Sequence, residues 1–131
     1  MLKRGITLEK EIIADENTSA VYMKSGTLNV FSTPSMVALM EDTSKDLVFP
    51  HLDEGYTTVG TSLDIKHVAS TPIGMKIRCV ATLIEIDNRT LTFDVKVYDE
   101  VGLIGEGRHQ RFIVNGDRFL AKTYAKNENR N

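Results

Sequence analysis

The spacing of apolar side chains predicts one long helix in the N-terminal half of the chain. Ser32 or Thr33 can cap its N-terminus, and Pro34 fits the first turn, where its missing N–H would have no partner anyway. Pro50 ends the helix, because the residue before a proline is pushed out of the helical region. We therefore expect a helix over residues 34–48. At about 100° per residue, its apolar stripe comprises Val37, Met40, Ser44, Leu47 and Val48.

Alternation of apolar and polar residues predicts strands on both sides of this helix. A strand over residues 6–14 and a short strand over 20–23 precede it. Beyond Gly55 the pattern predicts four strands joined by short turns, over residues 59–69, 75–86, 91–98 and 103–114. One face of the first of these four is expected to carry Val59, Thr61, Leu63, Ile65, His67 and Ala69, and the other Gly60, Ser62, Asp64 and Lys66.

These elements predict a single α+β domain over residues 1–131. After the last strand we expect a short helix and a polar tail, residues 125–131, that frays. Because one helix is followed by a run of hairpins, the helix should cover one face of an antiparallel sheet. A sheet wrapped around one long helix is the layout of the hotdog fold. A ferredoxin-like fold would need a second long helix in mid-chain, and the sequence predicts none there.

Composition narrows the possible functions. The chain has 16 basic and 18 acidic residues and a net charge of −2, which argues against a nucleic-acid-binding module. The single cysteine, Cys79, excludes an intramolecular disulfide and lies where a core residue is expected. No long apolar run predicts a membrane span, and the first residues lack the apolar segment of a secretory signal, so we expect a cytoplasmic protein. The three histidines are too widely spaced to predict a metal site.

Two residues of the predicted helix could carry chemistry. Glu41 lies at the margin of the apolar stripe, where partial shielding from water suits acid–base work; alternatively it reaches water or pairs with Lys45. Thr33 is eight residues earlier on the same side, at the helix N-terminus, where the dipole and free N–H groups favour negative charge. Its simpler interpretation is an N-cap threonine before a proline.

Two strands add further candidates. His67 shares a predicted face with apolar residues, so it is either a core histidine or a general base that works near neutral pH. On the last strand, His109 and Arg111 share a face with two glycines, Gly105 and Gly107. Glycines in a strand mark close approach of a ligand or another backbone, and an arginine beside them can bind an anion.

Three segments together resemble a known family: VFSTPSMVALME (30–41), VGTSLDIKHVASTPIGMKI (59–77) and IGEGRHQRFIV (104–114). They are similar to the fluoroacetyl-CoA thioesterase and its hotdog-fold relatives. The resemblance implies Thr33, Glu41 and His67 as catalytic residues, and Gly60, His67 and Arg111 as residues that contact the substrate or its coenzyme A.

The resemblance further implies an acyl-CoA thioester hydrolase that releases CoA and a carboxylic acid. Such an enzyme needs no metal and no separate cofactor, because coenzyme A is part of the substrate. The resemblance also implies a homodimer and is compatible with a higher oligomer. We expect neither nucleic acid nor a membrane as a partner. The alternatives are a non-catalytic acyl-CoA-binding hotdog module and an enoyl-thioester hydratase. The family's fluoroacetyl enzyme has phenylalanines before the helix, whereas residues 23–29 here (MKSGTLN) have none, so we expect no fluoroacetyl selectivity.

Overall fold

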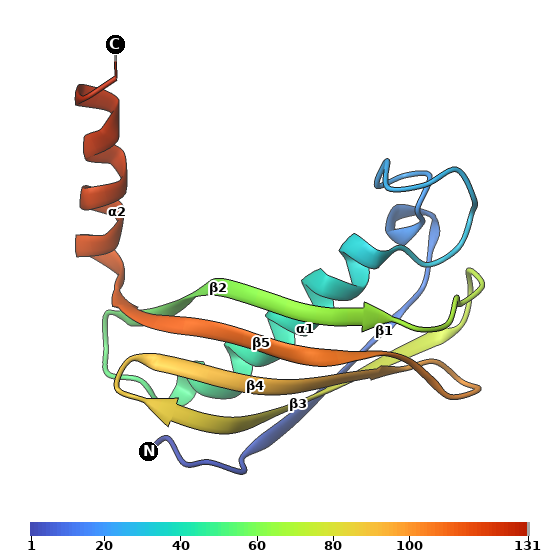
Figure 1. Ribbon diagram of the computed structural model, residues 1–131, viewed down its shortest axis with the longest axis horizontal. Coiled ribbons are helices and arrows are strands. Elements are labelled where there is room, and N and C mark those ends of the chain that lie inside the picture. Colours follow the sequence, from blue (N-terminus) through green and yellow to red (C-terminus); the bar gives the residue numbers. More distant parts are fainter. Residues whose placement is uncertain (131) are drawn as a thin grey trace.

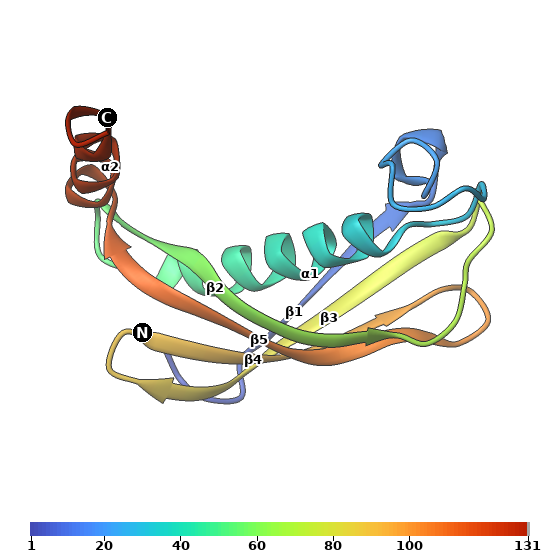
Figure 2. The ribbon, with the colours of Figure 1, turned by 45° about the horizontal axis from the view of Figure 1, so that its top comes forward.

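A 16-residue helix, α1 (Thr33–Val48), lies across one face of an antiparallel sheet in the computed structural model, which describes residues 1–130 (Figures 1 and 2). The sheet has the strand order β1-β3-β4-β5-β2. Its strands are β1 (Thr7–Ile13), β2 (Tyr56–His67), β3 (Lys76–Asp87), β4 (Thr90–Tyr98) and β5 (Leu103–Asn115). The predicted α+β layout, with one helix covering one face of a meander sheet, is confirmed.

At the start of α1, one residue caps the helix and the next is its first helical residue. Ser32 is the N-cap, and its hydroxyl accepts a hydrogen bond from the Ser35 backbone N–H at 3.2 Å. Thr33 is therefore the first helical residue rather than the cap, and its hydroxyl remains available for other contacts. The helix ends at Val48, before Pro50, as the sequence predicted.

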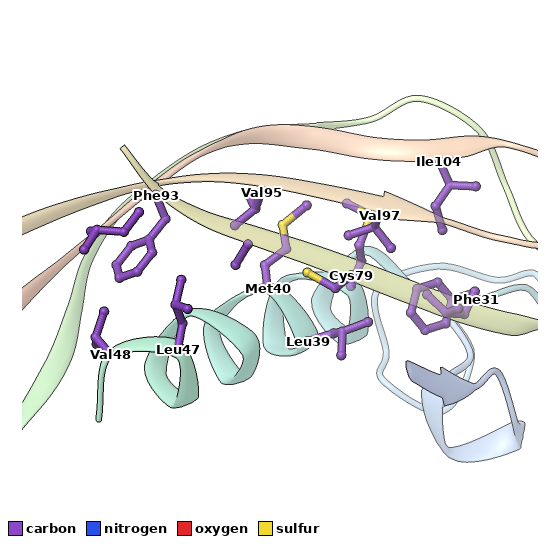
Figure 3. Close-up of a cluster of buried hydrophobic side chains, with 14 of the residues drawn as sticks. Phe31, Leu39, Met40, Leu47, Val48, Cys79, Phe93, Val95, Val97 and Ile104 are labelled. Carbon is purple, nitrogen blue, oxygen red and sulfur yellow. The ribbon is translucent and has the colours of Figure 1, made fainter. Parts of the chain in front are cut away.

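The buried face of α1 and the inner face of the sheet form one core. Figure 3 shows Met40 directed from the helix towards Val95 and Leu47 directed towards Phe93, whereas Leu39 lies below Cys79, on the side of Phe31. Removal of such side chains from water contributes roughly 1.5–3 kcal/mol each. The buried helix residues are Met36, Leu39, Met40, Thr43, Ser44, Leu47 and Val48. Cys79 also belongs to this core, and burial raises the pKa of its thiol to about 11.

The buried face of α1 differs slightly from the predicted apolar stripe. Met36, Leu39 and Thr43 are buried although they were not assigned to it, and Val37 is only partly buried. The buried face is wider than the predicted stripe, because α1 packs against three strands, β3, β1 and β4. Val37 consequently lies at the margin of the core, on the same side as Glu41.

The short strand predicted over residues 20–23 is wrong. This segment forms turns that follow a 3-10 helix, η1 (Glu16–Thr18). Asp15 and Thr18 form a reciprocal capping box, and the Ser19 hydroxyl accepts from the Tyr22 backbone N–H at 3.1 Å. These local side-chain bonds stabilise turns in place of an extended backbone. The segment then runs on as a loop to the start of α1.

The predicted faces of β2 are only half right, because a bulge interrupts its pairing with β5. The register shifts between Gly60 and Ser62. A bulge inserts one residue, so the alternation of side chains reverses across it. Thr58 and Gly60 therefore point towards α1 before the bulge, whereas His67 does so after it.

The C-terminal segment extends away from the sheet (Figure 1). It forms α2 (Gly116–Tyr124), capped by Asn115, and then a 3-10 turn, η3 (Ala125–Glu128). Helical structure thus continues to Glu128 in the tail that composition predicted would fray, helped by a 3.4 Å bond from the Asn129 side-chain amide to the Ala125 carbonyl. A second 3-10 turn, η2 (Phe49–His51), follows α1. Within residues 1–130, no helix is long and apolar enough to cross a membrane.

Candidate active site

Thr33 and His67 meet at one end of the sheet. The Thr33 Oγ1 and the His67 Nδ1 are 2.7 Å apart, a hydrogen-bond distance between a hydroxyl and an imidazole. Thr33 comes from the first turn of α1 and His67 from the last residue of β2, so two predicted site residues 34 positions apart are brought together. This is the arrangement in which an imidazole can take the proton of a hydroxyl.

His67 is held in a partly apolar environment. Its ring lies edge-on to Phe31, with ring centroids 6.5 Å apart. Its Nε2 is buried and has no hydrogen-bond partner among the described residues. Burial lowers the pKa of His67 below the ordinary value of 6.5. The imidazole is therefore neutral at pH 7 and able to act as a base.

A pocket of about 350 Å³ opens beside this pair. Its walls come from the loop before α1, from the start of α1 and from the segment that follows β2. The lining residues are Ala20, Ser25, Val30, Phe31, Ser32, Thr33, His67, Val68, Ala69 and Ser70. Small and polar side chains therefore surround most of the space next to the Thr33 hydroxyl.

A second polar cluster lies under the middle of α1, around Arg111 of β5. The Arg111 side chain is only 7% exposed. Its Nε donates to Thr58 Oγ1 at 2.7 Å, and its Nη2 donates to the Thr58 carbonyl at 3.0 Å. Its Nη1 lies 3.3 Å from His109 Nε2 and 3.6 Å from Glu41 Oε2. Burial lowers the pKa of Arg111, and the charge of Glu41 opposes that shift.

Glu41 belongs to this cluster and not to the Thr33–His67 pair. Its side chain is 42% exposed and faces the Arg111 guanidinium, so it is partly shielded at the margin of the stripe and also reaches water. The suggested pairing with Lys45 is also wrong, because Lys45 binds Asp42 at 2.8 Å and Asp46 at 3.5 Å. These two aspartates also bind Lys10 of β1, which draws the polar face of α1 towards that strand.

Gly60 lies against the second cluster, and a side chain at this position would have to displace the Glu41 carboxylate. A Cβ atom at Gly60 would lie 2.8 Å from Glu41 Oε2, and 3.4 Å from both Arg111 Nη1 and His109 Cε1. The backbone of β2 can thus approach the carboxylate closely only because this residue is glycine. Gly60 and Arg111 are also opposite one another in the β2–β5 register.

The structure therefore divides the predicted site into two parts. Thr33 and His67 form the first, and Glu41, Gly60 and Arg111 the second. Thr33 and Glu41 are eight residues apart on α1, which separates them by about 12 Å along the axis. Arg111 is enclosed by protein groups, so the structure does not place it as an exposed anchor for coenzyme A.

Two polar residues of the second cluster, Thr58 and His109, were not among the assigned site residues. His109 shares its strand face with Arg111, as the alternation predicted, and this alone could have indicated it. Thr58 precedes the predicted strand and has no motif around it. Within residues 1–130, no group of three or more His, Cys, Asp or Glu side chains is arranged to hold a metal ion.

The long helix across one face of an antiparallel sheet is the layout of the hotdog fold. A threonine–histidine pair lies beside a pocket at the helix N-terminus. A model of the family described as "Fluoroacetyl-CoA-specific thioesterase" matches residues 13–117. The chain belongs to this family.

Relatives agree with this assignment. A fluoroacetyl-CoA thioesterase of Streptantibioticus cattleyicolor is 35% identical over 97 residues, which are 74% of this chain and 70% of that protein. A solved structure of a fluoroacetyl-CoA thioesterase superposes with a TM-score of 0.92 and 26% identity, covering 96% of this chain and 98% of the other. A Thermus thermophilus member of the thioesterase superfamily gives a TM-score of 0.88 and 27% identity, with 97% and 94% coverage.

The close approach at Gly60 leads to a first prediction. In the Gly60→Ala variant the new methyl group should displace the Glu41 carboxylate, and thioesterase kcat/KM should fall by about 10- to 100-fold, since a displacement near 1 Å can cost about 100-fold. Gly102→Ala is the matched control, because a Cβ there meets no atom within 4 Å. Steady-state kinetics of both variants make the comparison. Parental activity in Gly60→Ala would show that the position of Glu41 is not critical.

Proposed function

We propose that the protein hydrolyses acyl-CoA thioesters and that Thr33, His67 and Glu41 carry the reaction. The observation that supports this most strongly is the 2.7 Å contact between the Thr33 hydroxyl and the imidazole of His67, beside a pocket of about 350 Å³. A nucleophile within hydrogen-bond distance of a neutral base is the minimum requirement for acyl transfer. A purely structural N-cap threonine would not need a histidine partner.

The first step follows from this geometry. His67 Nδ1 takes the proton of Thr33 as its Oγ1 bonds to the thioester carbonyl carbon. The carbonyl oxygen becomes an oxyanion, which the dipole at the N-terminus of α1 stabilises. The C–S bond then breaks, and the thiolate of coenzyme A receives the proton held by His67. The acyl group remains as an ester on Thr33.

Water completes the reaction. His67, neutral again, takes a proton from a water molecule as the water oxygen bonds to the acyl carbon. The ester bond to Thr33 then breaks, the Thr33 oxygen receives that proton, and the carboxylic acid leaves. We assign to Glu41 the orientation of the substrate over Gly60. Arg111 beside Glu41, at 3.6 Å, keeps the carboxylate oriented for this role. Gly60 supplies the backbone surface over which substrate and carboxylate approach each other.

We propose a homodimer formed through β2. This strand is at the edge of the sheet, and residues 60–64 in its centre are exposed. An unpaired edge strand with both faces open is a template for pairing with another strand. Two copies related by a two-fold axis would join their sheets and cover this edge. We also propose that such dimers can assemble into higher oligomers. The proposed location of the protein is the cytoplasm.

We propose that the protein has no selectivity for a fluoroacetyl group. The loop side of the pocket carries Ala20, Ser25 and Val30, with Phe31 as the aromatic residue of the lining. No phenylalanine precedes Phe31 in the chain. The features that would recognise a fluorinated acyl group through an aromatic lid are therefore missing from this segment.

A panel of acyl-CoAs tests the proposed function. Short, medium and fluorinated acyl-CoAs are incubated with the purified protein and a thiol-trapping dye that reports released CoA. We expect turnover of at least one non-fluorinated acyl-CoA, with no preference for fluoroacetyl-CoA. Binding without CoA release would instead support a non-catalytic module, and addition of water to an enoyl-CoA without CoA release would support a hydratase.

Substitution of the first pair provides a second test. His67→Ala should lower kcat by about 10²–10⁴, the usual effect of losing a general base. Thr33→Ser should retain most of the activity and Thr33→Ala should lose it, because only the hydroxyl reacts. Since burial lowers the pKa of His67, the acid fall in the parental kcat should have its midpoint below pH 6.5. Parental turnover in His67→Ala would overturn the mechanism.

Sedimentation tests the proposed assembly. At micromolar concentration we expect the mass of two chains, because the exposed centre of β2 has no other cover in a single chain. The measurement uses sedimentation equilibrium at several protein concentrations. A stable monomer across that range would contradict the pairing of β2 edges.

A further inference from the structure

His109 lies at the centre of the second cluster, and no role has been assigned to it above. It is 1% exposed, and its ring stacks on Phe93 with a centroid distance of 6.0 Å. Its Nδ1 lies 2.8 Å from the carbonyl oxygen of Ser62 in β2. Its Nε2 lies 3.3 Å from Arg111 Nη1. Both ring nitrogens of this buried histidine therefore have a polar contact, as buried polar atoms generally do.

These contacts define the tautomer of His109. A carbonyl oxygen can only accept, so Nδ1 must carry the hydrogen that it donates to Ser62. A guanidinium can only donate, so Nε2 must accept from Arg111 Nη1. Both requirements are met by one neutral form, the Nδ1–H tautomer. Burial, with Arg111 nearby, lowers the pKa of His109, while the Ser62 carbonyl and Glu41 oppose the shift.

The same contacts determine where Glu41 is held. Thr58 accepts from the Nε and Nη2 of Arg111, which leaves Nη1 as the nitrogen that faces both His109 and Glu41. Without an acceptor at His109 Nε2, the Nη1 of Arg111 would be free to turn towards the partly exposed Glu41 carboxylate. The carboxylate would then move away from its position over Gly60. His109 therefore fixes the direction in which Arg111 presents its charge.

We propose that His109 is a positioning residue of the thioesterase, acting through Arg111 to hold the Glu41 carboxylate over Gly60. This inference rests on the proposed function of Glu41. It predicts that catalysis requires the hydrogen-bond acceptor that His109 Nε2 offers to Arg111, and not the imidazole ring as such.

Two amide substitutions separate the two ring contacts. The side-chain amide of glutamine places its polar atoms near Nε2, so His109→Gln keeps an acceptor for Arg111. That of asparagine places them near Nδ1, so His109→Asn keeps only the contact to Ser62. We expect kcat to fall by about tenfold or more in His109→Asn and to be largely restored in His109→Gln, with KM changing less than kcat. Equal losses in the two variants would overturn the proposal, because they would indicate a packing role.

A double-mutant cycle with Glu41 makes the test specific. In a Glu41→Gln background, His109→Asn should cost little further activity, because the group that it positions has already been lost. Full additivity of the two losses would contradict the proposal. Val95→Ala is the control for a general loss of core packing. Val95 is fully buried in β4, so this variant should lower the melting temperature while kcat, measured below that temperature, stays near the parental value.

A measurement independent of turnover separates this proposal from the proposed function. Nitrogen chemical shifts of the histidine rings in the parental protein should show the neutral Nδ1–H tautomer for His109 at pH 7. Observation of the Nε2–H tautomer would overturn the positioning role even if thioesters are hydrolysed. If the tautomer is as expected but no acyl-CoA is hydrolysed, the network stands and the proposed function fails.

Discussion

The burial of one guanidinium, that of Arg111, constrains the rest of the active-site region. An unpaired buried charge costs several kcal/mol, so every donor of this side chain needs a partner. Thr58 supplies its hydroxyl and its carbonyl, His109 supplies a ring nitrogen, and Glu41 supplies the opposite charge. These partners come from β2, β5 and α1, so satisfying one side chain fixes three elements relative to one another. The helix is thereby held at a definite distance above the sheet.

The irregularity of β2 follows from the same constraint. Thr58 must point inwards to reach Arg111, and Gly60 must leave space for the carboxylate. Farther along the strand, His67 must also point inwards to reach Thr33, although regular alternation would turn it away from the face of Thr58 and Gly60. The shift between Gly60 and Ser62 supplies the one extra residue that reconciles these demands. The Ser62 carbonyl at this bulge also accepts from His109, so the bulge is bonded directly to the network.

Sequence reasoning succeeded where the signal was local and failed where it depended on register. The bounds of α1 could be predicted because Pro34, Pro50 and the apolar spacing act within the segment itself. The bulge could not, since it depends on β5 and on what lies opposite. The family resemblance assigned Glu41 and His67 to one catalytic set, and the structure places their side chains in two separate clusters. The contacts of His109 and Thr58 join residues 47 and 53 positions apart in the chain, and no periodicity in the sequence predicts such a pairing.

Three consecutive residues at the start of α1 explain how a reactive hydroxyl can lie at a helix N-terminus without serving as its N-cap acceptor. Ser32 caps the helix, and its hydroxyl accepts from Ser35. Pro34 has no N–H and needs no partner in the first turn. Thr33, between them, has no capping duty, so its hydroxyl turns to His67. Were Thr33 itself the cap, its oxygen would accept from a backbone N–H and be a poorer nucleophile. The stability of the helix and the reactivity of the site thus depend on adjacent residues and do not compete for one atom.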